Sequence, residues 1–214
     1  MLLPKLHYIS KGDTPNEHLK NIQKACTFGF EWIQLAINNI SDKKFLKIAN
    51  EAREITAHFQ TRLLITDHYK VAKAIKADGV FLRNKEISPT TIRNHIYNWQ
   101  ILGGAAHNLQ DCKLLLNQKV DYISLGPYDD IILEDRLPET LDLNAYNTIV
   151  DVLKTKIPII ANGNITTNDV LSLLEIGIYG VAVSNEITND FNIIRKFNEL
   201  LKASSTKEQR HSFK

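Results

Sequence analysis

Two carboxylates that follow neighbouring apolar runs of the sequence could hold a metal ion. Asp67 comes directly after the run 62–66, and Glu86 follows the run 79–82. Carboxylate oxygens are the ligands that Mg²⁺ prefers in proteins, and a bound Mg²⁺ can in turn hold a substrate phosphate. The alternative interpretation is that Asp67 caps a helix beginning near His68 and that Glu86 is a solvated charge.

A segment near the end of the chain has the composition of a phosphate-binding loop. Gly163 and Asn164 precede residues 166–167, which we expect to start a helix, and Ser184 and Asn185 follow the next apolar run. Backbone N–H groups ahead of a helix bind phosphate. Asn also adopts the left-handed conformation of such loops more readily than most residues. The alternative is an ordinary connection between a strand and a helix.

Single polar residues within or after other apolar runs are further candidates. Gln34 alternates with Trp32 and Ala36, so its amide needs a hydrogen-bond partner, either a ligand or a neighbouring strand. His107 could act as a base or a donor, or it could be a structural histidine with satisfied hydrogen bonds. The Arg83 guanidinium could bind phosphate through two parallel hydrogen bonds.

Eight short apolar runs alternate with longer segments of helical periodicity. The runs are mostly apolar on both faces, as buried parallel strands are. They cover residues 6–10, 32–36, 62–66, 79–82, 101–105, 122–126, 158–162 and 180–184. The clearest amphipathic segment is 41–59, for which Ser41 is the expected N-cap. Asn108 and Thr167 are expected to cap two further helices.

Eight β/α units in about 200 residues predict a single (β/α)8 TIM barrel of the α/β class. An open doubly wound sheet also uses βαβ units, but the sequence lacks a dinucleotide-binding fingerprint, so the open sheet is the second choice. We expect the barrel to cover residues 1–204 and residues 205–214 to form a flexible polar tail. Because the active sites of such barrels lie on loops after the C-terminal strand ends, the candidate residues above would share one rim.

Composition and motifs argue against several classes of function. The chain has 214 residues, and its 26 Lys and Arg against 24 Asp and Glu give a net charge of +2, which predicts no nucleic-acid partner. No apolar run approaches the ~20 residues of a membrane span, so no membrane partner is expected. Cys26 and Cys112 stand alone, which is typical of the reducing cytoplasm. The sequence has no HExxH, GxSxG or GxxxxGK(S/T) motif.

Six stretches of the sequence, taken in order, carry a family resemblance. They are 32–35, 63–67, 77–82, 120–127, 158–165 and 180–184. Through them the chain resembles the thiamine-phosphate synthase and TenI-like barrels over about residues 5–203. The resemblance implies an enzyme that uses Mg²⁺ to join hydroxymethylpyrimidine diphosphate to thiazole phosphate, with release of pyrophosphate. It also implies a small phosphorylated heterocyclic ligand and a homodimer.

The resemblance further implies roles for single residues. Gln34 would contact the pyrimidine, Asp67 would be a metal ligand, and Glu86 stands where the family has a second metal-binding Asp. Mg²⁺ is thus the expected cofactor, while no residue is assigned a catalytic role. The thiazole phosphate would lie against Gly163, Asn164, Ser184 and Asn185, and the other expected substrate-binding residues are Arg83, His107 and Gly126.

The sequence departs from the family pattern at the positions that hold pyrophosphate. The family motif Gln-x-Arg-x-Lys has Ala36 and Asn38 in place of its two cations, and the family motif Thr-x-Thr-Lys aligns with Ile-Ile-Leu-Glu at 131–134. Arg83 stands at a glycine position of the family. The His that TenI-type tautomerases place after the glycine of strand six is Pro127 here, so tautomerase activity is not expected.

These departures leave two main hypotheses. A hydrogen bond to a charged group contributes ~1.5–3 kcal/mol, so the loss of three donors would remove roughly 5–8 kcal/mol. At ~1.4 kcal/mol per tenfold change, the reaction would slow by about 10⁴-fold or more. The chain is then either a weak synthase with a rearranged site, or a non-catalytic binding or regulatory barrel for thiazole phosphate or another phosphorylated metabolite. A third alternative, an unrelated phosphate-sugar barrel enzyme, lacks visible Lys and Asp acid–base residues at the strand ends.

Overall fold

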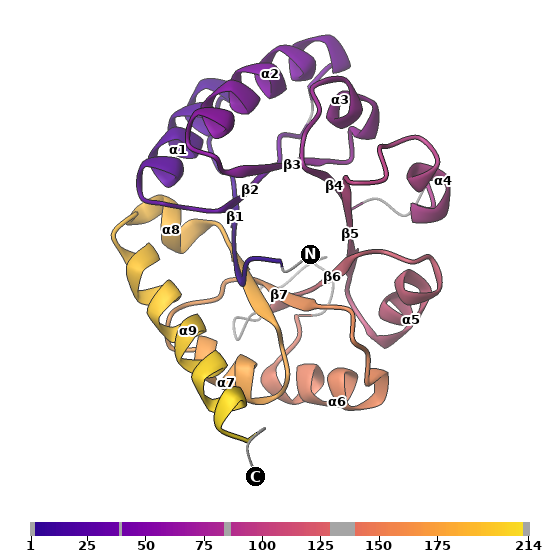
Figure 1. Cartoon of the computed structure of the whole chain (residues 1–214), viewed down its shortest axis with the longest axis vertical. Coiled ribbons are helices and arrows are strands. Elements are labelled where there is room, and N and C mark those ends of the chain that lie inside the picture. The colour runs from indigo at the N-terminus through magenta and orange to yellow at the C-terminus, as the bar shows by residue number, and fades with distance from the viewer. Residues whose placement is uncertain (1–2, 39, 84–86, 129–139, 212–214) are drawn as a thin grey trace.

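The computed structural model describes residues 3–38, 40–83, 87–128 and 140–211. Parallel strands close into a barrel in the order β1 to β8, and Figure 1 shows the helices arranged around them. The strands are β1 (Leu6–Ile9), β2 (Trp32–Leu35), β3 (Arg62–Thr66), β4 (Gly79–Leu82), β5 (Ile101–Ala106), β6 (Tyr122–Tyr128), β7 (Ile159–Gly163) and β8 (Gly180–Val183). The predicted (β/α)8 barrel is therefore confirmed.

The helices follow the strands in alternation. They are α1 (Pro15–Thr27), α2 (Asp42–His58), α3 (Tyr69–Ala74), α4 (Pro89–Arg93), α5 (Leu109–Asn117), α6 (Leu143–Leu153), α7 (Val170–Glu175), α8 (Asn185–Asn189) and α9 (Ile193–His211). Helix α9 extends into the segment 205–214, whose flexibility stays a prediction. Among the described residues, no helix combines the length and the apolar character needed to cross a bilayer.

The strands are apolar on both faces because the barrel has two separate cores. Successive strand side chains point to opposite faces, and one set packs inside the barrel. This interior cluster consists of Leu3, Trp32, Leu64, Phe81, Ile101, Tyr122, Ile160 and Ala182. Their chain neighbours, such as Ile33 and Val80, pack outside with the helices in the main core.

Aromatic rings fill the barrel interior at the N-terminal ends of the strands. The His7 ring stacks on Trp32 with 4.7 Å between ring centroids, and Trp32 meets Tyr122 edge-on at 6.0 Å. Gly103 leaves room for this packing, since a Cβ there would overlap the Tyr122 ring. These side chains come from the beginnings of their strands, so they fill the interior at the N-terminal end of the barrel.

Two of the three predicted helix caps are confirmed. Asn108 precedes α5 and its side chain accepts a backbone N–H of the first turn at 2.9 Å. Ser41 occupies the N-cap position of α2 without a side-chain cap bond. The prediction for Thr167 is wrong, because α7 begins only after Asp169. Asp169 instead closes a turn, accepting hydrogen bonds from the backbone N and the Oγ1 of Thr166 at 2.8 and 2.7 Å.

Candidate functional site

A layer of polar side chains lies above the interior cluster, toward the C-terminal end of the strands. Gln34 and Thr66 stand two positions after Trp32 and Leu64, so they share the inward face of β2 and β3. The amide Nε2 of Gln34 donates to Thr66 Oγ1 at 3.0 Å, and both residues are buried. The neighbouring strand, one of the two partners expected for this amide, therefore satisfies it.

A second pair of inward positions repeats this arrangement across the mouth. Asn162 on β7 donates from Nδ2 to the Oγ of Ser124 on β6 at 2.8 Å. Gly126 lies next to this pair, and a Cβ at Gly126 would overlap the backbone oxygen of Asn162. The floor of the mouth is thus lined by amide and hydroxyl groups rather than by charges.

Arg83 and Asp67 form an ion pair at the rim, at the ends of β4 and β3. The backbone N of Arg83 donates to Asp67 Oδ1 at 2.8 Å. Its guanidinium donates from Nε to Asp67 Oδ2 at 3.1 Å, with Nη2 3.0 Å from the same oxygen. The side chains are 42% and 27% exposed, so the pair is accessible from solvent. The expected metal ligand and the expected phosphate-binding residue therefore bind each other.

The backbone of Asp67 is held in the left-handed region with φ of 60°, which Asp tolerates better than most residues. Its N–H donates to the carbonyl oxygen of Phe81 at 2.8 Å and so continues the pairing of β3 with β4. The alternative interpretation of Asp67 as a helix cap is wrong, because His68 is the N-cap residue of α3. The Asp67 carboxylate is turned to the neighbouring strand instead.

His107 follows β5 and is fixed by two hydrogen bonds. Its Nδ1 lies 2.6 Å from the carbonyl oxygen of Gly126 on β6, which makes Nδ1 the donor, and its backbone N donates to Asp111 Oδ2 at 3.0 Å. A neutral ring that donates from Nδ1 presents Nε2 as an acceptor. No described residue bonds to Nε2, so this atom is available for a hydrogen bond from a ligand.

The loops after β7 and β8 lie side by side, as those strands pair. Gly163 ends β7 with φ of 130°, so the positive φ expected at Asn164 belongs to Gly163, where the absence of a Cβ removes its cost. The Oγ of Ser184 donates to the carbonyl oxygen of Ile9 on β1 at 2.9 Å. Ser184 is one of the four residues expected around a phosphate. In the structure its hydroxyl group also joins β8 to β1.

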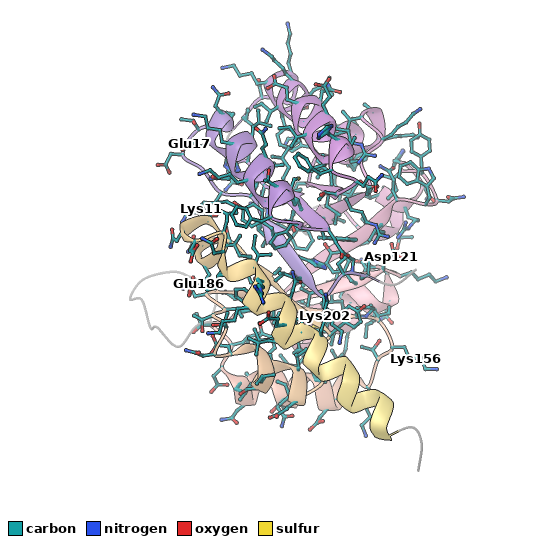
Figure 2. The ribbon with its side chains drawn as sticks, turned by 60° about the vertical axis from the view of Figure 1, so that its left-hand side comes forward. Lys11, Glu17, Asp121, Lys156, Glu186 and Lys202 are labelled. Carbon is teal, nitrogen blue, oxygen red and sulfur yellow. The ribbon has the colours of Figure 1, made fainter. Side chains whose placement is uncertain are left out.

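Lys11, which sequence reasoning missed, reaches the same loops from β1. Its Nζ donates to the Oδ1 of Asn185 at the start of α8. Figure 2 shows Lys11 and Glu186, the residue after Asn185, on the same flank of the molecule. Its position directly after the first strand was the available signal, because every strand end of a barrel contributes to the rim.

A cavity of about 640 Å³ opens between the loops that follow β1 and β2. Ala36 and Asn38, the two departures from the family motif, line it together with Lys11 and Lys44 of α2. The acidic side chain of Asp13 lines it as well. Both lysines are exposed, so the cations of this cavity come from the loop and the helix rather than from the strand.

A buried histidine holds the wall of this cavity. Ser10 Oγ accepts the backbone N–H of Ala36 at 3.2 Å and lies 2.9 Å from His18 Nδ1, to which it donates. Burial lowers the pKa of His18, although a backbone hydrogen bond to Gly12 opposes the shift. The neutral ring therefore fixes the loops after β1 and β2 relative to each other.

The sequence of the chain matches the family model described as thiamine monophosphate synthase over residues 6–187. The chain belongs to the thiamine monophosphate synthase family. Thiamine-phosphate synthase of Flavobacterium psychrophilum is 33% identical over 203 residues, which cover 92% of this chain and 98% of that protein. The enzyme of the same name from Flavobacterium johnsoniae is 32% identical over 206 residues, covering 94% of this chain and 97% of its own length.

Solved structures of this family share the barrel. Thiamine phosphate pyrophosphorylase from Pyrococcus furiosus superposes with a TM-score of 0.75 at 23% identity, covering 95% of this chain and 96% of that one. The corresponding protein of Bacteroides thetaiotaomicron gives a TM-score of 0.65 at 15% identity, covering 95% and 98%. At these identities the likeness establishes the fold.

Several family positions expected to carry chemistry lie outside the described residues. They include Glu86 and the family motif at 131–134. Within the described part of the chain, no three His, Cys, Asp or Glu residues are grouped as a metal site. The Asp67 carboxylate, the described member of the expected Mg²⁺ pair, has both oxygens bonded to Arg83. The described donor set therefore does not fit the metal that the family resemblance implies.

Proposed function

We propose that this chain binds hydroxymethylpyrimidine diphosphate and thiazole phosphate and joins them slowly, with release of pyrophosphate. The observation that carries the proposal is the chemistry of the barrel mouth in a chain of this family. Lys11 and Arg83 follow two different strands at one rim, above a floor of amides and hydroxyls. Cations and hydrogen-bond donors on such a rim are suited to phosphorylated ligands.

The thiazole phosphate is assigned to the loops after β7 and β8. Gly163, Asn164, Ser184 and Asn185 surround this position, as the family resemblance implies. Lys11 adds a positive charge at its edge, because its ammonium group is held by Asn185. A lysine placed there attracts a phosphate dianion without needing a fixed fork geometry.

The pyrimidine diphosphate is assigned to the mouth near Gln34 and Arg83 and to the adjoining cavity. Its diphosphate gains negative charge as the bond to the pyrimidine methylene carbon breaks and the thiazole nitrogen bonds to that carbon. Cations that stabilise this charge lower the barrier.

The family has two cations at the positions of Ala36 and Asn38. In this chain Lys11 and Lys44, which line the same cavity, would supply the positive charge instead. Both are exposed to solvent, and Lys11 is shared with Asn185, so they stabilise a developing charge less than buried, preorganised groups do. The proposal therefore includes slow turnover.

A non-catalytic binding or regulatory barrel is the second candidate. The ion pair of Arg83 with Asp67 favours it, since the carboxylate expected to hold Mg²⁺ is already bonded. A direct assay with both heterocycles separates the two functions: formation of thiamine phosphate above the uncatalysed rate supports the synthase. If no product forms, calorimetry with thiazole phosphate alone decides whether the barrel binds it, and no heat at millimolar ligand would contradict both candidates.

A reducing cytoplasm and a homodimer remain part of the proposal. Cys26 and Cys112 are both buried and unpaired, which supports a compartment in which thiols stay reduced. Sedimentation of the purified chain tests the dimer. A single species with the 24.4 kDa mass of one chain would contradict it.

A further inference from the structure

The pairing of Arg83 with Asp67 bears on how the barrel neutralises phosphate. Asp67 Oδ1 accepts the backbone N–H of Arg83 at 2.8 Å, and Oδ2 accepts from the guanidinium Nε at 3.1 Å. Nη2 lies 3.0 Å from Oδ2 as well. Both oxygens are therefore engaged by the same residue, once through its backbone and once through its side chain.

Strand pairing holds the backbone on both sides of this ion pair. Asp67 has φ of 60°, and its backbone N–H donates to Phe81 at 2.8 Å. Arg83 follows directly after β4, whose residue Phe81 pairs with Thr66 of β3. The register of two adjacent strands thus brings the guanidinium and the carboxylate together.

A divalent cation at this carboxylate would meet a permanent positive charge. A guanidinium stays protonated in proteins and has five N–H donors in a fixed planar fork. Asp67 accepts from Nε and Nη2, and no described residue accepts from the other guanidinium donors of Arg83. The outer edge of the fork can therefore donate two parallel hydrogen bonds to phosphate oxygens.

We infer that Arg83 takes the place of the divalent cation at Asp67, and that the site binds the diphosphate of its ligand through this guanidinium without a metal ion. The inference rests on the proposed function for the identity of the ligand. The chemistry it needs is more general, since any pyrophosphate group presents the oxygens that the fork can bind. In this arrangement Asp67 orients Arg83, and Arg83 contacts the ligand.

Titrations with inorganic pyrophosphate and with Mn²⁺ test the inference without either heterocycle. The wild-type chain should bind pyrophosphate equally in EDTA and in Mg²⁺, within about twofold. Arg83→Gln should weaken that binding by about tenfold or more, the loss expected for hydrogen bonds to a charged group. Arg195→Gln is the matched control, because it removes the same charge from an exposed pair with Glu199 on α9, and it should change nothing.

Mn²⁺ binding followed by electron paramagnetic resonance gives the second readout. The wild-type chain should leave millimolar Mn²⁺ free, whereas Arg83→Gly, which restores the family glycine, should bind it at Asp67. Tight Mn²⁺ binding by the wild-type chain, or pyrophosphate binding that requires Mg²⁺, would overturn the inference.

If Arg83→Gln does not fold, Arg83→Lys replaces it, because this variant keeps the charge but not the fork. Pyrophosphate binding by Arg83→Lys with the affinity of the wild-type chain would also contradict the inference. Failure of the proposed function, by contrast, would appear only in the titrations and assays with the heterocycles.

Discussion

Lys11 and Asn185, separated by 174 residues, are joined by a hydrogen bond from Nζ to Oδ1. The bond connects the loop after the first strand with the start of α8, and Ser184 adds a second link to β1 at 2.9 Å. The closure of the barrel thus brings a cation to the loops assigned to the thiazole phosphate. The same lysine borders the cavity assigned to the diphosphate.

Lys11→Ala is therefore expected to weaken thiazole phosphate binding by about tenfold or more, because one hydrogen bond to a charged group is lost. Isothermal titration calorimetry with thiazole phosphate measures this. Lys44→Ala is the matched control, since it removes the same charge from a residue that lines the cavity on α2, away from Asn185 in sequence, and should alter this affinity by less than about twofold. Equal losses in the two variants would indicate a general effect of charge rather than a contact.

The buried pair of Gln34 and Thr66 gives a prediction about stability. Thr66→Val keeps the shape of the side chain but removes the oxygen that accepts the Gln34 amide at 3.0 Å. An unsatisfied buried donor costs about 1–3 kcal/mol, so the free energy of unfolding should fall by that amount. Urea denaturation measures it, and Thr27→Val on the exposed end of α1 should stay within about 0.5 kcal/mol of wild type. An unchanged Thr66→Val midpoint would mean that water or a repacked neighbour satisfies the amide.

His7 predicts how stability depends on pH. Burial lowers the pKa of His7 to about 3, although its hydrogen bond to Pro4 opposes the shift. The unfolded chain therefore binds a proton below about pH 6.5 that the folded chain excludes, and the resulting stability is present above that pH. The free energy of unfolding should fall by up to about 1.4 kcal/mol for each pH unit between 6.5 and 3.

The slope is measured by urea denaturation at pH 7.5, 6.0 and 5.0. His7→Gln should make it less steep, with a remainder from His18, whose pKa burial also lowers. His58→Gln, at the end of α2, should leave it as in wild type. If the slope in His7→Gln is the same as in wild type, groups other than His7 are responsible for the acid sensitivity.

Much of the fold could be predicted from the sequence because its signals are local. Strands buried on both faces produce unbroken apolar runs, and each of the eight runs overlaps one strand. Asn108 was identified as a cap because capping depends on residues within one turn. The prediction for Thr167 was wrong because a second local candidate follows it. Asp169, two residues later, accepts the hydrogen bond from Thr166 that closes the turn before the helix.

The contacts of the site were less predictable because they depend on strand register and barrel closure. The pairing of Arg83 with Asp67 follows from the alignment of Thr66 with Phe81 across β3 and β4, which hydrophobic periodicity does not encode. Lys11 was missed because its partner lies at the other end of the chain. Gln34 was correctly expected to need a partner, but the sequence could not tell Thr66 from a ligand.

The departures at Ala36 and Asn38 predict a gain of activity. Ala36→Arg combined with Asn38→Lys restores both cations of the family motif in the wall of the 640 Å³ cavity. Stronger binding of the leaving pyrophosphate should raise turnover by about tenfold or more. Ala36→Gln with Asn38→Gln provides bulk without charge and should not raise it. No gain in the charged variant would place the diphosphate elsewhere in the mouth.

The rate of thiamine phosphate formation by the wild-type chain tests the account most directly. It should be measured from hydroxymethylpyrimidine diphosphate and thiazole phosphate, beside the Flavobacterium psychrophilum relative under the same conditions. We predict turnover about 10⁴-fold slower than that of the relative, as expected from the loss of three charged contacts to pyrophosphate. Equal turnover by the two proteins would contradict the account, because the rearranged rim would then hold pyrophosphate as well as the family motifs do.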